Sequence, residues 1–122
     1  MLASATPVLR SGDYQRAKAF YTDILGFRCA EEAGEPAGFG IFIRDKARVF
    51  IEAYQGPEAS YHRWRAYFHV TDLDTLAAEI RAKGGKLSSE PKLTVYDMYE
   101  FEIIDPDGNV LCFGADPQAS NS

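Results

Sequence analysis

Apolar residues recur at helical spacing in two stretches of the chain, and an aspartate precedes each stretch. The first, from Tyr14 to about Leu25, carries its apolar stripe at Tyr14, Ala17, Phe20, Tyr21, Ile24 and Leu25. The second carries it at Leu73, Leu76, Ala77 and Ile80. We expect Asp13 and Asp72 to cap these helices, because a carboxylate accepts from the free backbone N–H groups of a first turn. Glycine follows both stripes and is expected to end the helices.

Short runs of alternating residues before and after the helices indicate β-strands. In the first half we expect strands near residues 6–10, 27–33, 39–44 and 48–54. In the second half we expect them near residues 64–70, 86–89, 95–104 and 110–114. The last two are joined by the turn sequence Asp-Pro-Asp-Gly at 105–108, where Pro106 presets φ and Gly108 can take a positive φ.

The two halves repeat one another. Asp13 and Asp72 are 59 residues apart, and so are Gly26 and Gly85. A strand–helix–strand–strand–strand unit therefore occurs twice, and neither unit is large enough to bury its sheet alone. The prediction is an α+β fold: two βαβββ modules in one domain, 1–122, forming a curved mixed sheet around a cleft with helices outside. Module 1 is expected at about 5–54, a linker at 55–62, module 2 at about 63–114 and a polar tail at 115–122.

Composition narrows the classes of function. The chain has 122 residues and a formal net charge of −5, with no basic stripe, so we expect no nucleic-acid binding. An acidic balance suits a cationic ligand or simply favours solubility. We find no signal peptide and no apolar run of membrane-spanning length, and therefore expect no membrane association. Cys29 and Cys112 form neither a disulfide framework nor a metal-spacing motif, which is typical of a cytoplasmic protein.

Several motifs together resemble the vicinal oxygen chelate superfamily, which includes glyoxalase I, extradiol dioxygenases, fosfomycin-resistance thiol transferases and bleomycin-resistance proteins. The matching segments cover nearly the whole chain. They are Ala5-Thr6-Pro7, Gly12-Asp13-Tyr14, Ala19-Phe20-Tyr21, Leu25-Gly26-Phe27, Phe50-Ile51-Glu52, Val70-Thr71-Asp72-Leu73 and Asp105-Pro106-Asp107-Gly108. The resemblance implies the paired βαβββ fold and a homodimer.

Enzymes of this family hold a divalent metal with inward-facing side chains on the first and last strand of each module. The corresponding positions here are Thr6, Glu52, Arg65 and Cys112. Only Glu52 is a usual ligand for these metals, and an arginine has no lone pair to donate. We therefore expect no metal and no other cofactor. Glu52 either orients a ligand or pairs with Arg65 in the cleft.

Strand alternation indicates which side chains face the cleft. Its expected lining is Val8, Arg10, Phe50, Glu52, Tyr54, Arg65, Tyr67, His69, Val110 and Cys112, with Phe39 and residues 96–99 at the rim. The same alternation assigns Trp64 to the core face, at its edge or at an interface. Glu100 and Glu102 share a face, where they either make the groove acidic or are merely solvated. An aromatic groove with a few charges suits a flat organic ligand, and its rings also suit a cationic one.

The resemblance is strongest to the bleomycin-resistance branch, which begins with Ala-Thr-Pro and lacks the metal ligands. It implies a homodimer that sequesters an aromatic or cationic antibiotic, of the bleomycin type or similar, without catalysis. The expected ligand-binding residues are Phe39, Phe50, Glu52, Tyr54, Trp64, Arg65, Tyr67, His69, Tyr96, Tyr99, Glu102 and Cys112. The alternative is an enzyme with a degenerate metal site on Glu52 and Cys112, or a metal-free one with Glu52 or His69 as base. A domain without a ligand of its own is a third reading.

Overall fold

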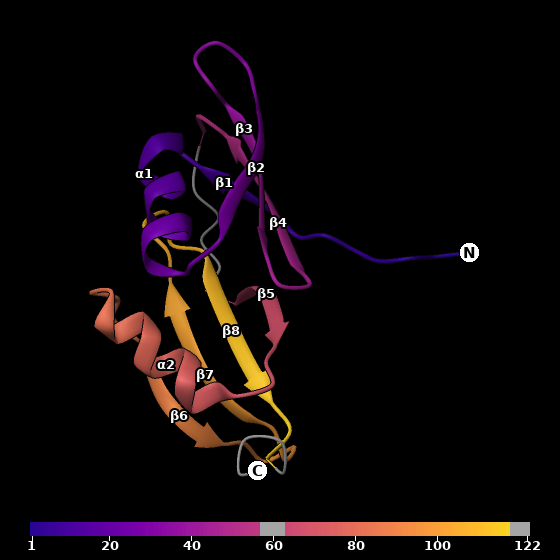
Figure 1. Cartoon of the computed structure of the whole chain (residues 1–122), viewed down its shortest axis with the longest axis vertical. Helices are drawn as coiled ribbons and strands as arrows, with labels where there is room; N and C mark the ends of the chain where they lie inside the picture. Colours follow the sequence, from indigo (N-terminus) through magenta and orange to yellow (C-terminus); the bar gives the residue numbers. More distant parts are fainter. Residues whose placement is uncertain (57–62, 118–122) are drawn as a thin grey trace. The chain divides into compact units, whose positions relative to one another are not determined.

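Each half of the chain forms one βαβββ unit, as the residue pattern predicts (Figure 1). The structure is a computed structural model that describes residues 1–56 and 63–117. The units comprise Met1–Tyr61 and His62–Ser122. The predicted linker 55–62 and tail 115–122 extend outside the described residues, so both stay predictions.

The first unit is a four-stranded sheet with one helix on a face. Its elements are β1 (Val8–Ser11), α1 (Tyr14–Ala19), the π-helical turn η1 (Phe20–Ile24), β2 (Arg28–Ala33), β3 (Phe39–Arg44) and β4 (Ala47–Ala53). β1 runs parallel to β4, whereas β2, β3 and β4 pair antiparallel, which gives the strand order β1-β4-β3-β2.

The second unit repeats this topology. Its elements are β5 (Trp64–His69), α2 (Leu73–Ala82), β6 (Ser89–Leu93), β7 (Tyr99–Ile104) and β8 (Val110–Ala115). The strand order is β5-β8-β7-β6, with β5 parallel to β8. The α+β fold of two βαβββ modules is therefore confirmed. Among the described residues, no helix is both long and apolar enough to cross a membrane.

The two helix starts are nearly identical. Asp13 and Asp72 accept a hydrogen bond from the backbone N–H of Arg16 and Thr75, each at 3.1 Å. Their φ/ψ angles, −144°/90° and −142°/91°, agree within a few degrees. Because the same cap recurs at the same place in both units, the spacing of 59 residues reflects a structural repeat.

The helix ends differ from the prediction by one residue. Gly26 takes a positive φ of 74°, but its counterpart is Gly84, at φ 89°, and not Gly85. The extra residue of the first helix lies in η1, where the N–H of Leu25 bonds to the carbonyl of Phe20, five residues back, at 3.2 Å. A π-helical turn holds one residue more than an α-helical turn, so it lengthens the first helix by one position.

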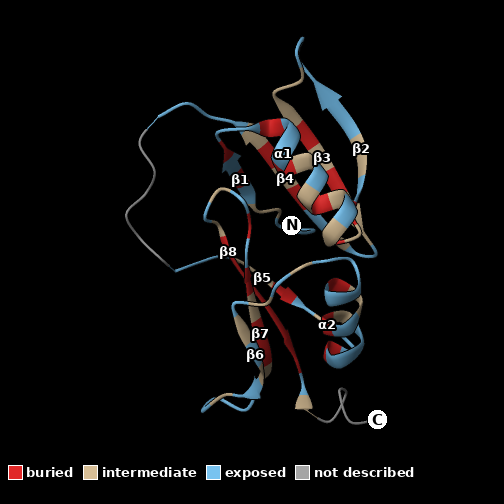
Figure 2. Ribbon diagram, turned by 90° about the vertical axis from the view of Figure 1, so that its left-hand side faces the viewer, coloured by how far each residue is buried: buried red, intermediate tan, exposed pale blue. Residues whose placement is uncertain are grey.

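Each core lies between a sheet and its own helix. Tyr14, Ala17 and Tyr21 of the first helix are buried against the sheet, as are Leu73, Ala77 and Ile80 of α2. In the second unit, Phe68, Phe113 and Phe101 are in register on β5, β8 and β7. Their rings stack, with centroids 5.0 and 5.2 Å apart. Figure 2 shows buried positions along the whole of β8.

Several strand bounds also differ from the prediction. The first strand begins at Val8, so Thr6 lies outside it; the preceding Pro7 has no N–H to donate to a ladder. The strand expected at 86–89 lies instead at Ser89–Leu93, and the strand expected at 95–104 begins at Tyr99. β6 contains Pro91, which an edge strand tolerates. The Asp-Pro-Asp-Gly turn is confirmed, with Gly108 at φ 84° and its N–H bonded to the carbonyl of Asp105 at 3.0 Å.

Candidate functional site

In the first unit, the sheet face opposite α1 carries aromatic and charged side chains. The register places Phe39 and Arg10 on either side of Glu52, and Phe50 two residues before it on the same face. The rings of Phe39 and Phe50 meet edge to face with centroids 5.4 Å apart. All these residues are half-buried or exposed. The strand alternation that predicted this face is confirmed for β1 and β4.

Glu52 has its ion-pair partner within its own unit. Arg10 Nε donates to Glu52 Oε1 at 3.2 Å, and the Arg10 guanidinium lies 4.3 Å from the centre of the Tyr54 ring. Arg10 and Glu52 are direct neighbours in the parallel β1–β4 ladder, so this ion pair forms across adjacent strands of one sheet. The expected pair of Glu52 with Arg65 would join the two units and stays a prediction. Because Glu52 already contacts a cation, its position suits a role in pairing with Arg10 or in orienting a ligand.

In the second unit, the face opposite α2 is formed by side chains from β5, β7 and β8. The register places Tyr67 beside Cys112 and His69 beside Gly114, with Glu102 and Glu100 on the far side of β8. The Tyr67 and His69 rings are 5.1 Å apart. This face, which we call the open face of the second sheet, therefore combines aromatic rings with two carboxylates and a thiol.

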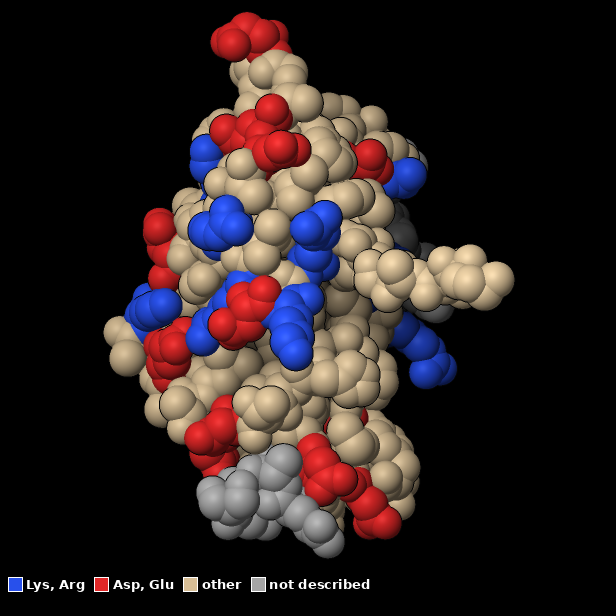
Figure 3. Space-filling model, turned by 45° about the vertical axis from the view of Figure 1, so that its right-hand side comes forward, with Lys and Arg blue, Asp and Glu red and all other residues tan. Residues whose placement is uncertain are grey.

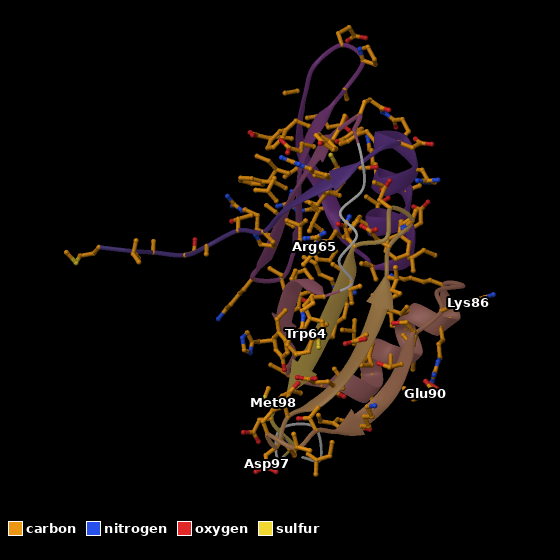
Figure 4. The ribbon with its side chains drawn as sticks, turned by 180° about the vertical axis from the view of Figure 1, so that it is seen from behind. Trp64, Arg65, Lys86, Glu90, Asp97 and Met98 are labelled. Carbon is orange, nitrogen blue, oxygen red and sulfur yellow. The ribbon has the colours of Figure 1, made fainter. Side chains whose placement is uncertain are left out.

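Trp64 lies on this open face and not on the core face, because β5 has a bulge. The ladder shifts by one residue between Trp64 and Ala66, so Trp64 pairs with Val110 and Arg65 occupies the irregular position. Trp64 Nε1 donates to Glu102 Oε2 at 2.6 Å, and its ring is 5.2 Å from that of Tyr67. Trp64 is 42% exposed. A bulge reverses which side chains face inward, and this explains why Trp64 lies on the open face although alternation assigned it to the core face. The side chains of Trp64 and Arg65 are labelled in Figure 4.

The side chain of Tyr67 extends from β5 across the neighbouring strand β8 to reach Glu100 on β7. Its hydroxyl donates to Glu100 Oε2 at 2.8 Å. The phenol ring passes over Gly114, where an added Cβ would stand 1.8 Å from the Tyr67 hydroxyl. Burial, followed by the hydrogen bond to Glu100, raises the pKa of Tyr67 above its ordinary value, so this phenol stays a hydrogen-bond donor. Because Gly114 has no side chain, the Tyr67 phenol can pass over it and bond to Glu100.

A second tyrosine reaches the same carboxylate from the turn between β6 and β7. Tyr96 hydroxyl donates to Glu100 Oε1 at 2.7 Å. Its turn is closed by the N–H of Thr94 bonding to the carbonyl of Met98 at 2.8 Å, with Asp97 at a positive φ of 63°. The hydrogen bond to Glu100 raises the pKa of Tyr96 to about 12. The labels of Asp97 and Met98 locate this turn in Figure 4.

Cys112 is fully buried beneath these groups. Burial, together with the charges of Glu100 and Glu102 and hydrogen bonding to Glu100, raises the pKa of its thiol far above the ordinary value. A thiol becomes a nucleophile or a zinc ligand only as a thiolate. Cys112 is thus held in its unreactive, protonated form, and it forms part of the floor of the open face.

The four positions at which family enzymes hold a metal do not fit one here. Thr6 lies outside the strands, Arg65 is a cation at a bulge, Glu52 is paired with Arg10 and Cys112 keeps its proton. In the part of the chain that the structure describes, no three His, Cys, Asp or Glu side chains are grouped to hold a metal ion.

The predicted ligand-binding residues divide between the two units. Phe39, Phe50, Glu52 and Tyr54 belong to the first, and Trp64, Arg65, Tyr67, His69, Tyr96, Tyr99, Glu102 and Cys112 to the second. Tyr99 lies apart from the others, on the helix-covered face, where its hydroxyl donates to Asp74 of α2 at 3.0 Å. Glu100 was expected on the same face as Glu102 but not among the binding residues. On the open face it accepts hydrogen bonds from the hydroxyls of Tyr67 and Tyr96. Only the register of Gly114 against Glu100 would have indicated it.

Charge on the described surface is mixed. On the face seen in Figure 3, Lys and Arg side chains alternate with Asp and Glu side chains. This pattern differs from the continuous basic surface that a nucleic-acid backbone requires.

Comparison with known proteins places this geometry in a family. The family model described as Glyoxalase/Bleomycin resistance protein/Dioxygenase superfamily matches residues 4–113. No curated protein gives a significant sequence match. Among solved structures, the chain resembles a bleomycin resistance determinant encoded on the transposon Tn5, at 24% identity and TM-score 0.80, with 95% of this chain and 99% of that chain covered.

Two further solved structures share the fold. One is a bleomycin-binding protein complexed with bleomycin, at 24% identity and TM-score 0.79, with 93% and 98% of the two chains covered. The other is a lactoylglutathione lyase from Agrobacterium tumefaciens, at 18% identity and TM-score 0.70, with 93% and 92% covered. The match of the family model over most of the sequence, with the βαβββ repeat, shows that this chain belongs to the glyoxalase/bleomycin resistance protein/dioxygenase superfamily.

Proposed function

We propose that this protein binds a small aromatic, cationic molecule without transforming it, as a sequestering protein of the bleomycin-resistance type. One observation carries the proposal: the open face of the second sheet combines aromatic rings and two carboxylates over a buried, protonated thiol. Trp64 and Tyr67 offer ring surface, and Glu100 and Glu102 offer negative charge beside it. Rings and carboxylates together suit a flat organic cation.

The same proposal includes a homodimer with the ligand in clefts at its interface, in the cytoplasm. The face of each sheet opposite its helix supports it, because Trp64 and Val8 remain 42% and 53% exposed there. Tryptophan in particular is enriched at protein interfaces. Both cysteines are free thiols, which suits a reducing compartment. Sedimentation equilibrium tests the dimer: a mass of one chain at micromolar concentration contradicts it.

The alternative is an enzyme of the same fold, either with a degenerate metal site on Glu52 and Cys112 or metal-free with Glu52 or His69 as a base. The structural similarity to a lactoylglutathione lyase supports this alternative. Two observations weigh against it. Glu52 is held by Arg10, and Cys112 is not available as a thiolate. Sequestration needs only the shape and charge of the two sheet faces. It therefore accounts for the observed side-chain contacts better than catalysis does.

Thermal unfolding with bleomycin and with divalent metals separates the two readings. We expect the unfolding midpoint to rise with bleomycin concentration, because a ligand that binds only the folded state stabilises it by mass action. We expect no change with zinc, nickel or iron, with or without chelator. A midpoint that rises with metal and falls on chelation would favour the enzyme instead.

A further inference from the structure

The carboxylate of Glu100 has an unusual environment. Its residue is only 6% exposed, yet the two donors that the structure shows on it are both neutral: the hydroxyls of Tyr67 and Tyr96. Within residues 1–56 and 63–117, no lysine, arginine or histidine forms an ion pair with it. Buried charges are normally paired, because neutral hydrogen bonds replace only part of the lost hydration.

The two tyrosines that bind Glu100 differ in how firmly they are placed. Tyr67 is half-buried between the rings of Trp64 and His69, and its phenol lies directly over Gly114. Tyr96 belongs to the turn between β6 and β7 and is 54% exposed. It is anchored by its hydroxyl, next to Val95, which is fully exposed. The hydrogen bond of Tyr96 is therefore the one that a ligand can replace at small cost.

From this arrangement, and resting on the proposed binding function, we propose that Glu100 recognises the protonated amine of an aromatic ligand and that Tyr96 is a displaceable donor that holds Glu100 until the amine arrives. The ammonium group takes the place of the Tyr96 hydroxyl at Oε1, while Tyr67 remains on Oε2. The aromatic part of the ligand lies against Trp64, which Glu102 holds in place. The ligand class is thus a planar ring system carrying a protonated amine.

The chemistry of the exchange favours a cation over a neutral ligand. A hydrogen bond from an ammonium to a carboxylate is about twice as strong as one between neutral groups. Replacing the Tyr96 hydroxyl by an ammonium therefore gains binding energy, whereas replacing it by a neutral hydroxyl gains none. Glu100 would in this way select for charge, and the rings would select for shape.

The test compares two ligands that differ only in charge. Tryptamine carries a protonated amine, and tryptophol carries a hydroxyl on the same indole ring. Isothermal titration calorimetry on the wild type is expected to give tighter binding of tryptamine by about tenfold or more, as one charge-assisted hydrogen bond would contribute. Glu100→Gln is expected to remove this preference, with tryptophol affinity changed by less than about twofold.

Tyr96→Phe tests the displaceable donor and leaves the ring in place. It removes the hydroxyl that competes for Glu100, so tryptamine binding should tighten by roughly fivefold, the equivalent of one neutral hydrogen bond. Tyr99→Phe is the matched control, because that hydroxyl is bonded to Asp74 on the helix-covered face; it should leave both affinities unchanged. In amide spectra, tryptamine but not tryptophol should shift the signals of Val95 and Asp97.

The outcomes distinguish this inference from the proposed function. If bleomycin, tryptamine and tryptophol all fail to bind the wild type, both are overturned. If they bind but Tyr96→Phe weakens tryptamine or leaves it unchanged, Tyr96 is not a displaceable donor and this inference alone fails. Equal affinity of the wild type for tryptamine and tryptophol also overturns it. Should Glu100→Gln not fold by circular dichroism, the Tyr96→Phe comparison still decides.

Discussion

At the scale of single residues, the open face of the second sheet depends on an absent side chain. Gly114 leaves room for the Tyr67 phenol, and Tyr67 in turn bonds to Glu100, which is in register with Gly114. Glycine weakens a strand in general. Its presence in the central strand β8 is explained by the ring that crosses it.

Gly114→Ala is therefore expected to lower the free energy of unfolding by about 1–3 kcal/mol, because the phenol must leave Glu100 with one donor fewer. Urea unfolding measures this cost. In a Tyr67→Ala background the same change should cost nothing, since the Cβ then meets no ring. An equal cost in both backgrounds would mean that Tyr67 is not the obstacle.

Cys112 predicts a dependence of stability on pH. Its folded pKa is raised, so above about pH 8.5 the unfolded thiol loses its proton while the folded thiol keeps it. The unfolded state then binds fewer protons, and stability falls by up to about 1.4 kcal/mol per pH unit. Below that pH the contribution is fully present.

Urea unfolding between pH 8.5 and 9.5, below the range where tyrosines titrate, measures this slope. Cys112→Ser cannot titrate there and should reduce the slope. Cys29→Ser serves as the matched control; burial also raises the pKa of that thiol, so it should remove a separate part of the slope. An unchanged slope in Cys112→Ser would contradict the protonated, buried thiol.

At the scale of elements, the repeated helix caps make each unit recognisable. Asp72 accepts from both the N–H and the hydroxyl of Thr75, at 3.1 and 2.8 Å. Asp72→Ala should lower the free energy of unfolding by about 1 kcal/mol, whereas Asp72→Asn, which can still cap, should cost much less. Chemical denaturation measures both. If Ala proves as stable as Asp, the cap does not fix the start of α2.

Local signals explain why most elements could be predicted from the sequence. The caps, apolar stripes and Asp-Pro-Asp-Gly turn each act within a few residues, so they appear in the sequence directly. The bulge at Arg65 does not, because it depends on pairing with β8, more than forty residues later. The π-helical turn was missed for a similar reason: its apolar stripe looks α-helical, and only the shift from Gly85 to Gly84 reveals it.

The candidate site follows the same rule. Strand alternation placed Arg10, Glu52, Tyr67 and Cys112 on the correct faces, because the ladders there are regular. It misplaced Trp64 at the bulge, and it could not foresee that Glu52 pairs with Arg10. Side-chain partners across strands depend on register, which no local pattern contains.

At the scale of the whole molecule, both units share a design in which one sheet face supplies the core and the other supplies chemistry. The helix-covered faces are apolar, with the Phe68–Phe113–Phe101 stack as the clearest case. The opposite faces combine rings with paired charges: Phe39, Phe50 and Arg10–Glu52 in one unit, and Trp64–Glu102 with Tyr67–Glu100 in the other. Binding requires no more than these faces provide.

The central claim, that the open face binds a ligand, is tested most directly by the indole signal of Trp64. The chain has one tryptophan, so its Nε1–H gives a single indole signal in a ¹H–¹⁵N spectrum. On titration with bleomycin, this signal should move and saturate, because a ligand against the Trp64 ring changes the surroundings of its indole N–H, while the amide of Gly84 beyond α2 stays in place. An indole signal that does not move while bleomycin is in large excess would contradict the account.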